Sequence, residues 1–234
     1  MSTPRILPRT ARLLPKPCRY NTHTRRTFIT LPEASPQLLT AARRLPYNHE
    51  RLYDIIADVD SYTRFLPYCK VSRVTQWTST PDAVGRRWPT RADLTAGWGG
   101  FEETYTSRVF CVPRLGIVEA ISGDASTEIP AAELRAHGLS DPGPGAGESG
   151  DGGVFKSLVT RWTVRPAEGA TRADRFQHDW SDVRLSIRYQ FANPLYMAVS
   201  AAVADKVAPV MIEAFVEQAK RILGETGKDA ENLR

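Results

Sequence analysis

The chain has 234 residues, of which 41% are hydrophobic and 24% are charged, so it is long enough to bury one substantial core. Its formal net charge of +5 comes from residues 1–32, which hold seven of the 31 basic residues and no acidic residue. The rest of the chain carries 24 basic against 26 acidic residues, a balance that argues against a nucleic-acid partner. The longest uncharged stretch, residues 189–204, has only 16 residues and is interrupted by Gln190 and Pro194, so it is too short and too polar to span a membrane.

The basic N-terminal segment is rich in Arg, Ser and Thr, a composition typical of a mitochondrial transit peptide. Its stretch Arg25-Arg26-Thr27-Phe28 is similar to the arginine-led context of matrix processing sites. The alternative is a disordered basic arm, because prolines at positions 4, 8, 15 and 17 weaken any amphipathic helix. We expect residues 1–36 to be a transit peptide and disordered leader.

The predicted elements begin with a strand over residues 38–45, which Pro46 ends. Asn48 can then cap a helix whose apolar residues follow at helical spacing. A second short helix is expected after Asp60 or Ser61 and before Pro67. Alternating apolar and polar residues and intervening turn residues then predict strands over 71–78, 88–96, 101–112 and 115–121.

The chain changes character between Ser122 and Gly153, where 11 of 32 residues are Gly or Pro and no residue is aromatic. This composition predicts a flexible, solvated insertion over 122–153 that builds no core of its own. Because the entropy of a loop changes slowly with its length, deleting Asp124 to Asp151 is expected to leave folding largely intact.

Strands are expected again over residues 155–164 and 182–191, and the second alternates apolar and polar residues most clearly. From Pro194 to about Leu223 the apolar residues follow a helical stripe, and Gly224 is placed to end the helix. The order of strand, two short helices, antiparallel strands and one long helix predicts an α+β fold. In such a fold a curved sheet grips the final helix and leaves a cavity between them.

Four segments carry a resemblance to a known family: Leu45-Pro46-Tyr47-Asn48; Ile56-Ala57-Asp58-Val59-Asp60-Ser61-Tyr62 with Phe65-Leu66-Pro67-Tyr68-Cys69; Tyr105-Thr106-Ser107-Arg108-Val109; and Asn193-Pro194-Leu195-Tyr196. Together, over about residues 38 to 224, they resemble the mitochondrial coenzyme Q-binding proteins of the START-like, polyketide cyclase/dehydrase-related superfamily. The insertion and Pro209 inside the final helix depart from the family pattern.

The resemblance implies a START-like helix-grip domain over residues 37–224, followed by a polar tail over 225–234. Its curved antiparallel sheet would wrap around the long C-terminal helix and enclose an apolar cavity. The bound ligand would be ubiquinone, without any further cofactor. The protein would act as a lipid chaperone, peripheral on the matrix side of the mitochondrial inner membrane, and support coenzyme Q in the respiratory chain and its biosynthesis. Candidate protein partners are the coenzyme Q biosynthetic complex and the respiratory complexes.

Candidate ligand-binding residues come from the aromatic residues on predicted strands, from the stripe on the final helix and from the loop after the second short helix. A one-layer sheet and one helix leave more apolar surface than they cover, so these residues are expected to line the cavity. They are Leu66, Pro67, Trp98, Phe101, Tyr105, Trp162, Tyr189, Phe191, Val203, Val207, Met211 and Phe215.

Residues suited to catalysis or metal binding are few. His49, His137 and His178 have no partner at metal-ligand spacing, and the cysteines form no metal motif. We therefore expect no catalytic residue, no metal site and no enzymatic activity. One alternative is an enzyme of the same superfamily, a cyclase or an enzyme modifying a quinone precursor, which would need a titratable residue inside the cavity. Another is a protein-interaction module, because bacterial relatives of this fold have been linked to ribosome binding.

The leader gives a first test. The mature protein is expected to begin between about Arg26 and Pro36, because the acid-free segment ends there and Glu33 is the first acidic residue. N-terminal sequencing of the protein purified from mitochondria measures this position. An intact Met1 would contradict the transit-peptide prediction.

Overall fold

The computed structural model describes residues 35–98, 101–143, 154–168, 180–193 and 195–224, without the side chains of residues 98, 101 and 195–204. All of its elements lie in one compact unit, Pro32–Arg234. Seven strands form a single sheet in the order β1-β7-β6-β5-β4-β3-β2, and every neighbouring pair is antiparallel. The strands are β1 (Gln37–Leu45), β2 (Cys69–Trp77), β3 (Pro89–Trp98), β4 (Phe101–Val112), β5 (Ile117–Gly123), β6 (Phe155–Pro166) and β7 (Ser181–Phe191).

The first helix, α1 (His49–Ala57), begins at its predicted cap. The Asn48 side chain accepts hydrogen bonds from the backbone N–H groups of Glu50, at 2.8 Å, and Arg51, at 3.4 Å. The second short helix is a 3₁₀ helix, η1 (Val59–Arg64), and it ends before Pro67 as expected. Both elements follow from local signals, because a cap and a proline act on the backbone next to them.

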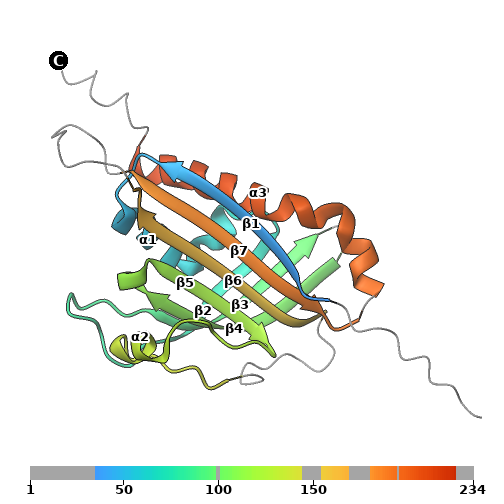
Figure 1. Ribbon diagram of the computed structural model, residues 1–234, viewed down its shortest axis with the longest axis horizontal. Helices are drawn as coiled ribbons and strands as arrows, with labels where there is room; N and C mark the ends of the chain where they lie inside the picture. The colour runs from blue at the N-terminus through green and yellow to red at the C-terminus, as the bar shows by residue number, and fades with distance from the viewer. Residues whose placement is uncertain (1–34, 99–100, 144–153, 169–179, 194, 225–234) are drawn as a thin grey trace, which may run out of the picture. The chain divides into compact units, whose positions relative to one another are not determined.

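The long final helix, α3 (Leu195–Leu223), continues through Pro209 and ends at Gly224. Gly224 has a φ of +86°, a conformation that glycine adopts without strain, and its N–H donates to the Lys220 carbonyl at 2.9 Å. The Tyr47 hydroxyl donates to the Gly224 carbonyl at 2.7 Å, which ties this end of α3 to the turn after β1. Figure 1 shows α3 lying along β1 and β7. The predicted α+β fold, a curved sheet with a C-terminal helix, is confirmed.

Alternation along the strands divides the buried residues between the two faces of the sheet. On β5, Val118 belongs to the main core between the sheet, α1 and α3, whereas Ile117 and Ile121 belong to a second cluster on the outer face. Two outer-face residues of β4, Phe110 and Val112, join this second cluster. The sheet is therefore covered on both faces.

The cover on the outer face is the segment that follows β5, and the expectation of a solvated insertion is wrong for residues 122–143. Ile129, Leu134 and Leu139 are buried against the outer-face cluster, and Leu134 lies on a short helix, α2 (Ala131–Ala136). Figure 1 shows α2 at the edge of the fold remote from α3. Residues 144–153 of the predicted insertion lie outside the described residues. Deleting the whole segment would uncover apolar surface on the sheet, so we expect the deletion to destabilise the fold, contrary to the expectation from composition.

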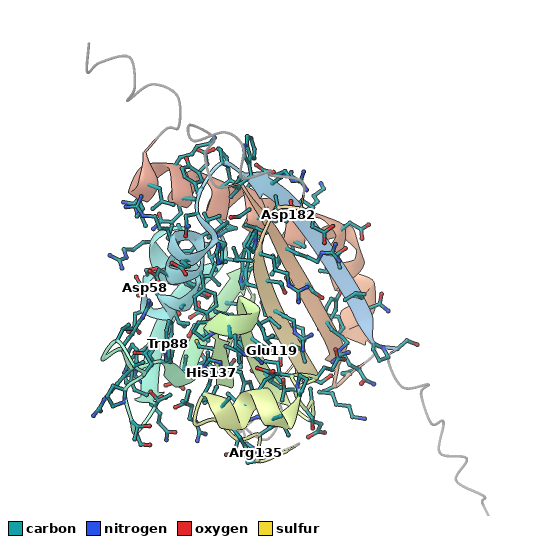
Figure 2. All side chains as sticks on the ribbon, turned by 60° about the vertical axis from the view of Figure 1, so that its left-hand side comes forward. Asp58, Trp88, Glu119, Arg135, His137 and Asp182 are labelled. Carbon is teal, nitrogen blue, oxygen red and sulfur yellow. The ribbon has the colours of Figure 1, made fainter. Side chains whose placement is uncertain are left out.

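Buried charges fix this cover to the sheet. Glu119 of β5 is fully buried, pairs with Arg161 of β6 and accepts a hydrogen bond from the Thr127 hydroxyl. Arg108 of β4, also buried, pairs with Asp141 at the other end of the segment. Figure 2 shows Glu119 on the side of the sheet that faces α2. Removing one partner of such a pair leaves a buried charge uncompensated, which costs about 3–5 kcal/mol.

The packing of α2 gives a second test. Leu134→Ala should lower the free energy of unfolding by about 2–5 kcal/mol, because it removes a side chain that is only 3% exposed from the outer-face cluster. Arg135→Ala on the same helix is the matched control, because Arg135 is exposed, and it should change stability by about 0.5 kcal/mol or less. Chemical denaturation of both variants measures the difference. Equal stabilities of Leu134→Ala and Arg135→Ala would show that residues 124–143 do not stabilise the fold.

Candidate functional site

A cavity of about 350 Å³ lies between the inner face of the sheet, η1 and α3. Its wall is mainly apolar, and its volume falls at the lower end of the range for small-molecule sites. The wall is formed by Leu39, Val59, Tyr62, Leu66, Pro67, Tyr68, Cys69, Leu94, Thr95, Ala96, Gly97, Glu102, Glu103, Tyr105, Ser107, Val109, Val118, Ala120, Val154, Phe155, Leu158, Thr160, Trp162, Ile187, Tyr189, Phe191, Val207 and Met211.

The strand registers show where the cavity ends. Trp162 lies opposite Val118 of β5 on one side and opposite Leu185 of β7 on the other. Val118 lines the cavity, whereas Leu185 is fully buried and does not line it. The next inward pair, Val164 and Val183, is also buried and lies outside the wall. Trp162 and Val118 therefore form the closed end, which we call the floor.

At the opposite end the wall reaches solvent. Tyr68, 39% exposed, and Glu102, whose side chain is 53% exposed, both line the cavity. Gly97 lies opposite Glu102 on β3, and its N–H donates to the Tyr68 carbonyl at 2.8 Å. We call Tyr68, Gly97 and Glu102 the mouth. Tyr68 has a φ of +66°, uncommon for a residue with a side chain, so the loop after η1 is held in an unusual conformation at this point.

Several polar groups of the wall have their hydrogen bonds satisfied within the protein. The Ser107 hydroxyl lies 2.8 Å from that of Ser122, and the Tyr62 hydroxyl donates to the Ile56 carbonyl at 2.5 Å. At the mouth, Glu102 pairs with Lys70, and Glu103 accepts a hydrogen bond from the Val154 N–H at 3.0 Å. Bonded in this way, these groups line an apolar space at little desolvation cost.

Burial keeps a thiol and two phenols of the wall in their protonated forms. Burial raises the pKa of the Cys69 thiol to about 11, so this group carries a proton near neutral pH and is a weak nucleophile. Burial also raises the pKa of the Tyr62 and Tyr105 phenols above the ordinary value. Within the described part of the chain, no three His, Cys, Asp or Glu side chains are grouped closely enough to hold a metal ion. The described wall is suited to enclosing an apolar molecule.

The structure brings most of the predicted ligand-binding residues to this wall. Those that line the cavity are Leu66, Pro67, Tyr105, Trp162, Tyr189, Phe191, Val207 and Met211. The side chains of Trp98, Phe101 and Val203 lie outside the described residues.

Phe215 differs from the expectation. It is 0% exposed and lies in the core, and its ring centroid is 5.4 Å from that of Trp162. It therefore supports the floor from behind instead of lining the cavity. Sequence periodicity places Phe215 on the same helical stripe as Met211, but it carries no information about where the cavity ends along that stripe.

Sequence reasoning missed aliphatic wall residues such as Leu39, Leu94, Leu158 and Ile187. A signal was present for two of them, because Leu158 precedes Trp162 on the inward-facing side of β6, and Ile187 precedes Tyr189 in the same way on β7. The prediction rested on the large aromatic residues, whereas the alternation along β6 and β7 identifies every residue on the inner face of the sheet.

Comparison with known proteins agrees with this architecture. The sequence pattern of the family described as "Polyketide cyclase / dehydrase and lipid transport" matches residues 45–216. The chain belongs to this family. The mitochondrial coenzyme Q-binding protein coq10 of Schizosaccharomyces pombe is 31% identical over 181 residues, which cover 77% of this chain and 85% of the yeast protein. The Ribosome association toxin RatA of Pseudomonas aeruginosa is 25% identical, over 77% of this chain and 93% of the toxin.

Solved structures show the same fold. The Zhui aromatase/cyclase from Streptomyces sp. R1128 superposes with a TM-score of 0.53 at 12% identity, over 82% of this chain and 99% of the cyclase. At this identity the likeness establishes the fold alone. None of the helices in the described ranges is both long enough and apolar enough to pass through a bilayer.

The different environments of Met211 and Phe215 give a third test. Phe215→Ala should lower the free energy of unfolding by about 3–5 kcal/mol, because it removes a fully buried ring from behind Trp162. Met211→Ala should cost less, because Met211 faces the cavity and has fewer protein atoms to lose. Thermal and chemical unfolding of the two variants measures the order. A Met211→Ala variant as unstable as Phe215→Ala would contradict the assignment of Met211 to a cavity wall.

Proposed function

We propose that this protein binds ubiquinone in the cavity and acts as a lipid chaperone for it. The observation that carries the proposal is the apolar cavity of about 350 Å³, closed at Trp162 and open at Tyr68, in a chain related to proteins named for coenzyme Q binding. The mainly apolar wall favours the binding of an apolar molecule.

The energetics of the ligand favour a carrier that works at a membrane. Exposing one five-carbon isoprenoid unit to water costs about 3–4 kcal/mol, because each methylene-sized group contributes about 0.8 kcal/mol. A cavity of about 350 Å³ has room for the ring and part of the tail, so the rest of a long tail stays in lipid. The mouth would then face the membrane, with Leu66, Pro67 and exposed Tyr68 at the point of ligand entry.

The leader supports a mitochondrial location, and the relatives that carry the coenzyme Q-binding name are also named mitochondrial. We place the protein on the matrix side of the inner membrane, attached peripherally. There it would supply ubiquinone to the respiratory complexes or hold it for the biosynthetic complex.

A second candidate function is association with ribosomes, because several bacterial relatives are named ribosome association toxins. The near balance of charges beyond residue 32 weighs against an RNA surface. Sedimentation of the purified protein with ribosomes at several salt concentrations tests it. Salt-sensitive binding would favour this second function, and its absence would leave the lipid ligand as the better account.

The ligand proposal makes a fourth prediction, on α3. Val207→Asp should abolish copurification of ubiquinone while the protein still unfolds cooperatively, because it places an unpaired carboxylate in the cavity wall. Val210→Asp is the matched control: Val210 lies on the same helix but is 40% exposed and outside the wall, so this variant should keep its ligand.

Lipid extraction followed by mass spectrometry of protein purified from ubiquinone-producing cells measures the bound quinone, and calorimetry measures the unfolding transition. Ubiquinone at the parental ratio in Val207→Asp would contradict the cavity as its site. So would a parent protein that carries no quinone at all.

A further inference from the structure

Three hydroxyl groups on the cavity wall lack a hydrogen-bond partner. Those of Tyr105, Tyr189 and Thr160 make no hydrogen bond to any described residue. In the described part of the chain, two side-chain polar atoms are both unpaired and without exposed surface: Nε of Arg108 and the indole nitrogen of Trp162, which lacks an acceptor. The three hydroxyls are not among them, so each of them has exposed surface.

The other hydroxyls of the wall are satisfied within the protein or lie where water reaches them. Those of Tyr62, Thr95 and Ser107 form hydrogen bonds to protein groups. Tyr68 is 39% exposed at the mouth. The unpaired hydroxyls further inside the cavity therefore form a distinct set.

The strand registers place Thr160 in the middle of the wall. On β6 it lies between Ala120 of β5 and Ile187 of β7, and all three residues line the cavity. Because the flanking residues on both neighbouring strands belong to the wall, the exposed surface of Thr160 faces the cavity.

The two tyrosines lie on the same inner face. Leu94 of β3 is opposite Tyr105, Leu158 of β6 is opposite Tyr189, and all four line the cavity. Tyr189 is only 7% exposed. Burial raises the pKa of both phenols, so both keep their protons near neutral pH and can donate a hydrogen bond.

We propose that the hydroxyls of Tyr105, Tyr189 and Thr160 hydrogen-bond to the ring oxygens of ubiquinone and make the cavity select an oxygenated ring over a plain hydrocarbon. This inference rests on the proposed function and adds the residues that determine its specificity. Ile187 lies opposite Thr160 and Leu158 opposite Tyr189, so Thr160 and Tyr189 are diagonal neighbours, about 7–8 Å apart between Cα atoms. One substituted ring can span that distance. The isoprenoid tail has no oxygen, so within the ligand only the ring can pair with these hydroxyls.

Removing the hydroxyls while keeping the shape of the wall tests the proposal. Tyr105→Phe, Tyr189→Phe and Thr160→Val should unfold as the parent does, because none of them breaks a hydrogen bond within the described protein. Each should weaken the binding of a short-tailed ubiquinone, ubiquinone-2, by about two- to tenfold, and the triple variant should weaken it further. Binding of a hydrocarbon that has the same tail and no oxygen should be unchanged.

Thr163→Val is the matched control on the same strand. Thr163 lies opposite Ile117 of the outer-face cluster and outside the cavity wall. This variant should bind both molecules as the parent does.

Infrared difference spectra of bound, carbonyl-labelled ubiquinone-2 provide a readout that a purely structural role would not change. In the parent protein at least one carbonyl band should lie at lower frequency than in a hydrocarbon solvent, because its oxygen accepts a hydroxyl proton. In the triple variant that band should return toward the solvent position. Parental bands at the solvent positions, or a shift that the triple variant keeps in full, would overturn the proposal.

The two levels of the proposal fail differently. If the parent binds no ubiquinone, the proposed function fails together with the role of the hydroxyls. If the parent binds ubiquinone and the triple variant binds it equally well, or loses hydrocarbon and quinone in parallel, the role of the hydroxyls is wrong and the ligand proposal stands.

Discussion

The inner face of the sheet has more apolar surface than one helix can cover, and the cavity follows from this constraint. On this face, the described part of α3 contacts β1 and β7 most closely and α1 contacts β5 and β6, so the inner faces of β3 and β4 have less cover from these two helices. Where bulky residues from both sides meet, as Trp162 and Phe215 do, the space is filled and the cavity ends. Where the wall residues of the sheet and of α3 do not meet, the space stays open as the cavity.

The outer face solves the opposite problem. Among the described residues no long helix covers this face. The segment after β5 covers it with three apolar residues, Ile129, Leu134 and Leu139, and its Thr127 hydroxyl and Asp141 carboxylate bond to Glu119 and Arg108. Buried ion pairs add little net stability but strongly disfavour any arrangement that separates them. They therefore fix the position of residues 124–143 on the sheet, although the composition of this segment predicts a flexible loop.

Much of the fold could be predicted because its signals are local. Asn48 caps α1, alternation marks β7, and Gly224 ends α3, and each depends only on neighbouring residues. The cover over residues 122–143 was not predicted, because the glycines and prolines of the whole stretch outweigh three spaced apolar residues when composition is averaged. The apolar partners of those residues lie on β4, β5 and β6, and no local pattern reports them.

The candidate site was predictable in kind but not in extent. Alternation on β6 and β7 brings Trp162, Tyr189 and Phe191 to one face, and this much follows from the sequence. The boundary between wall and core depends on where α3 approaches the sheet, and for that reason Met211 lines the cavity while Phe215 does not. The missing acceptor at Trp162 is a property of its three-dimensional surroundings, so no sequence pattern could have pointed to it.

The pairing of β1 with β7 has a consequence for how the domain is made. Gln37 lies opposite Tyr189, and Leu45 opposite Ser181, so among the described strands the first strand of the domain pairs with the last one alone. Such long-range contacts slow folding, since the closure entropy of the intervening chain has to be lost before they form. While a ribosome or a translocation channel still holds the C-terminal third of the chain, β7 cannot pair with β1. The sheet is therefore completed only after nearly the whole polypeptide has been released, and until then its N-terminal strand is an unpaired edge for chaperones to protect.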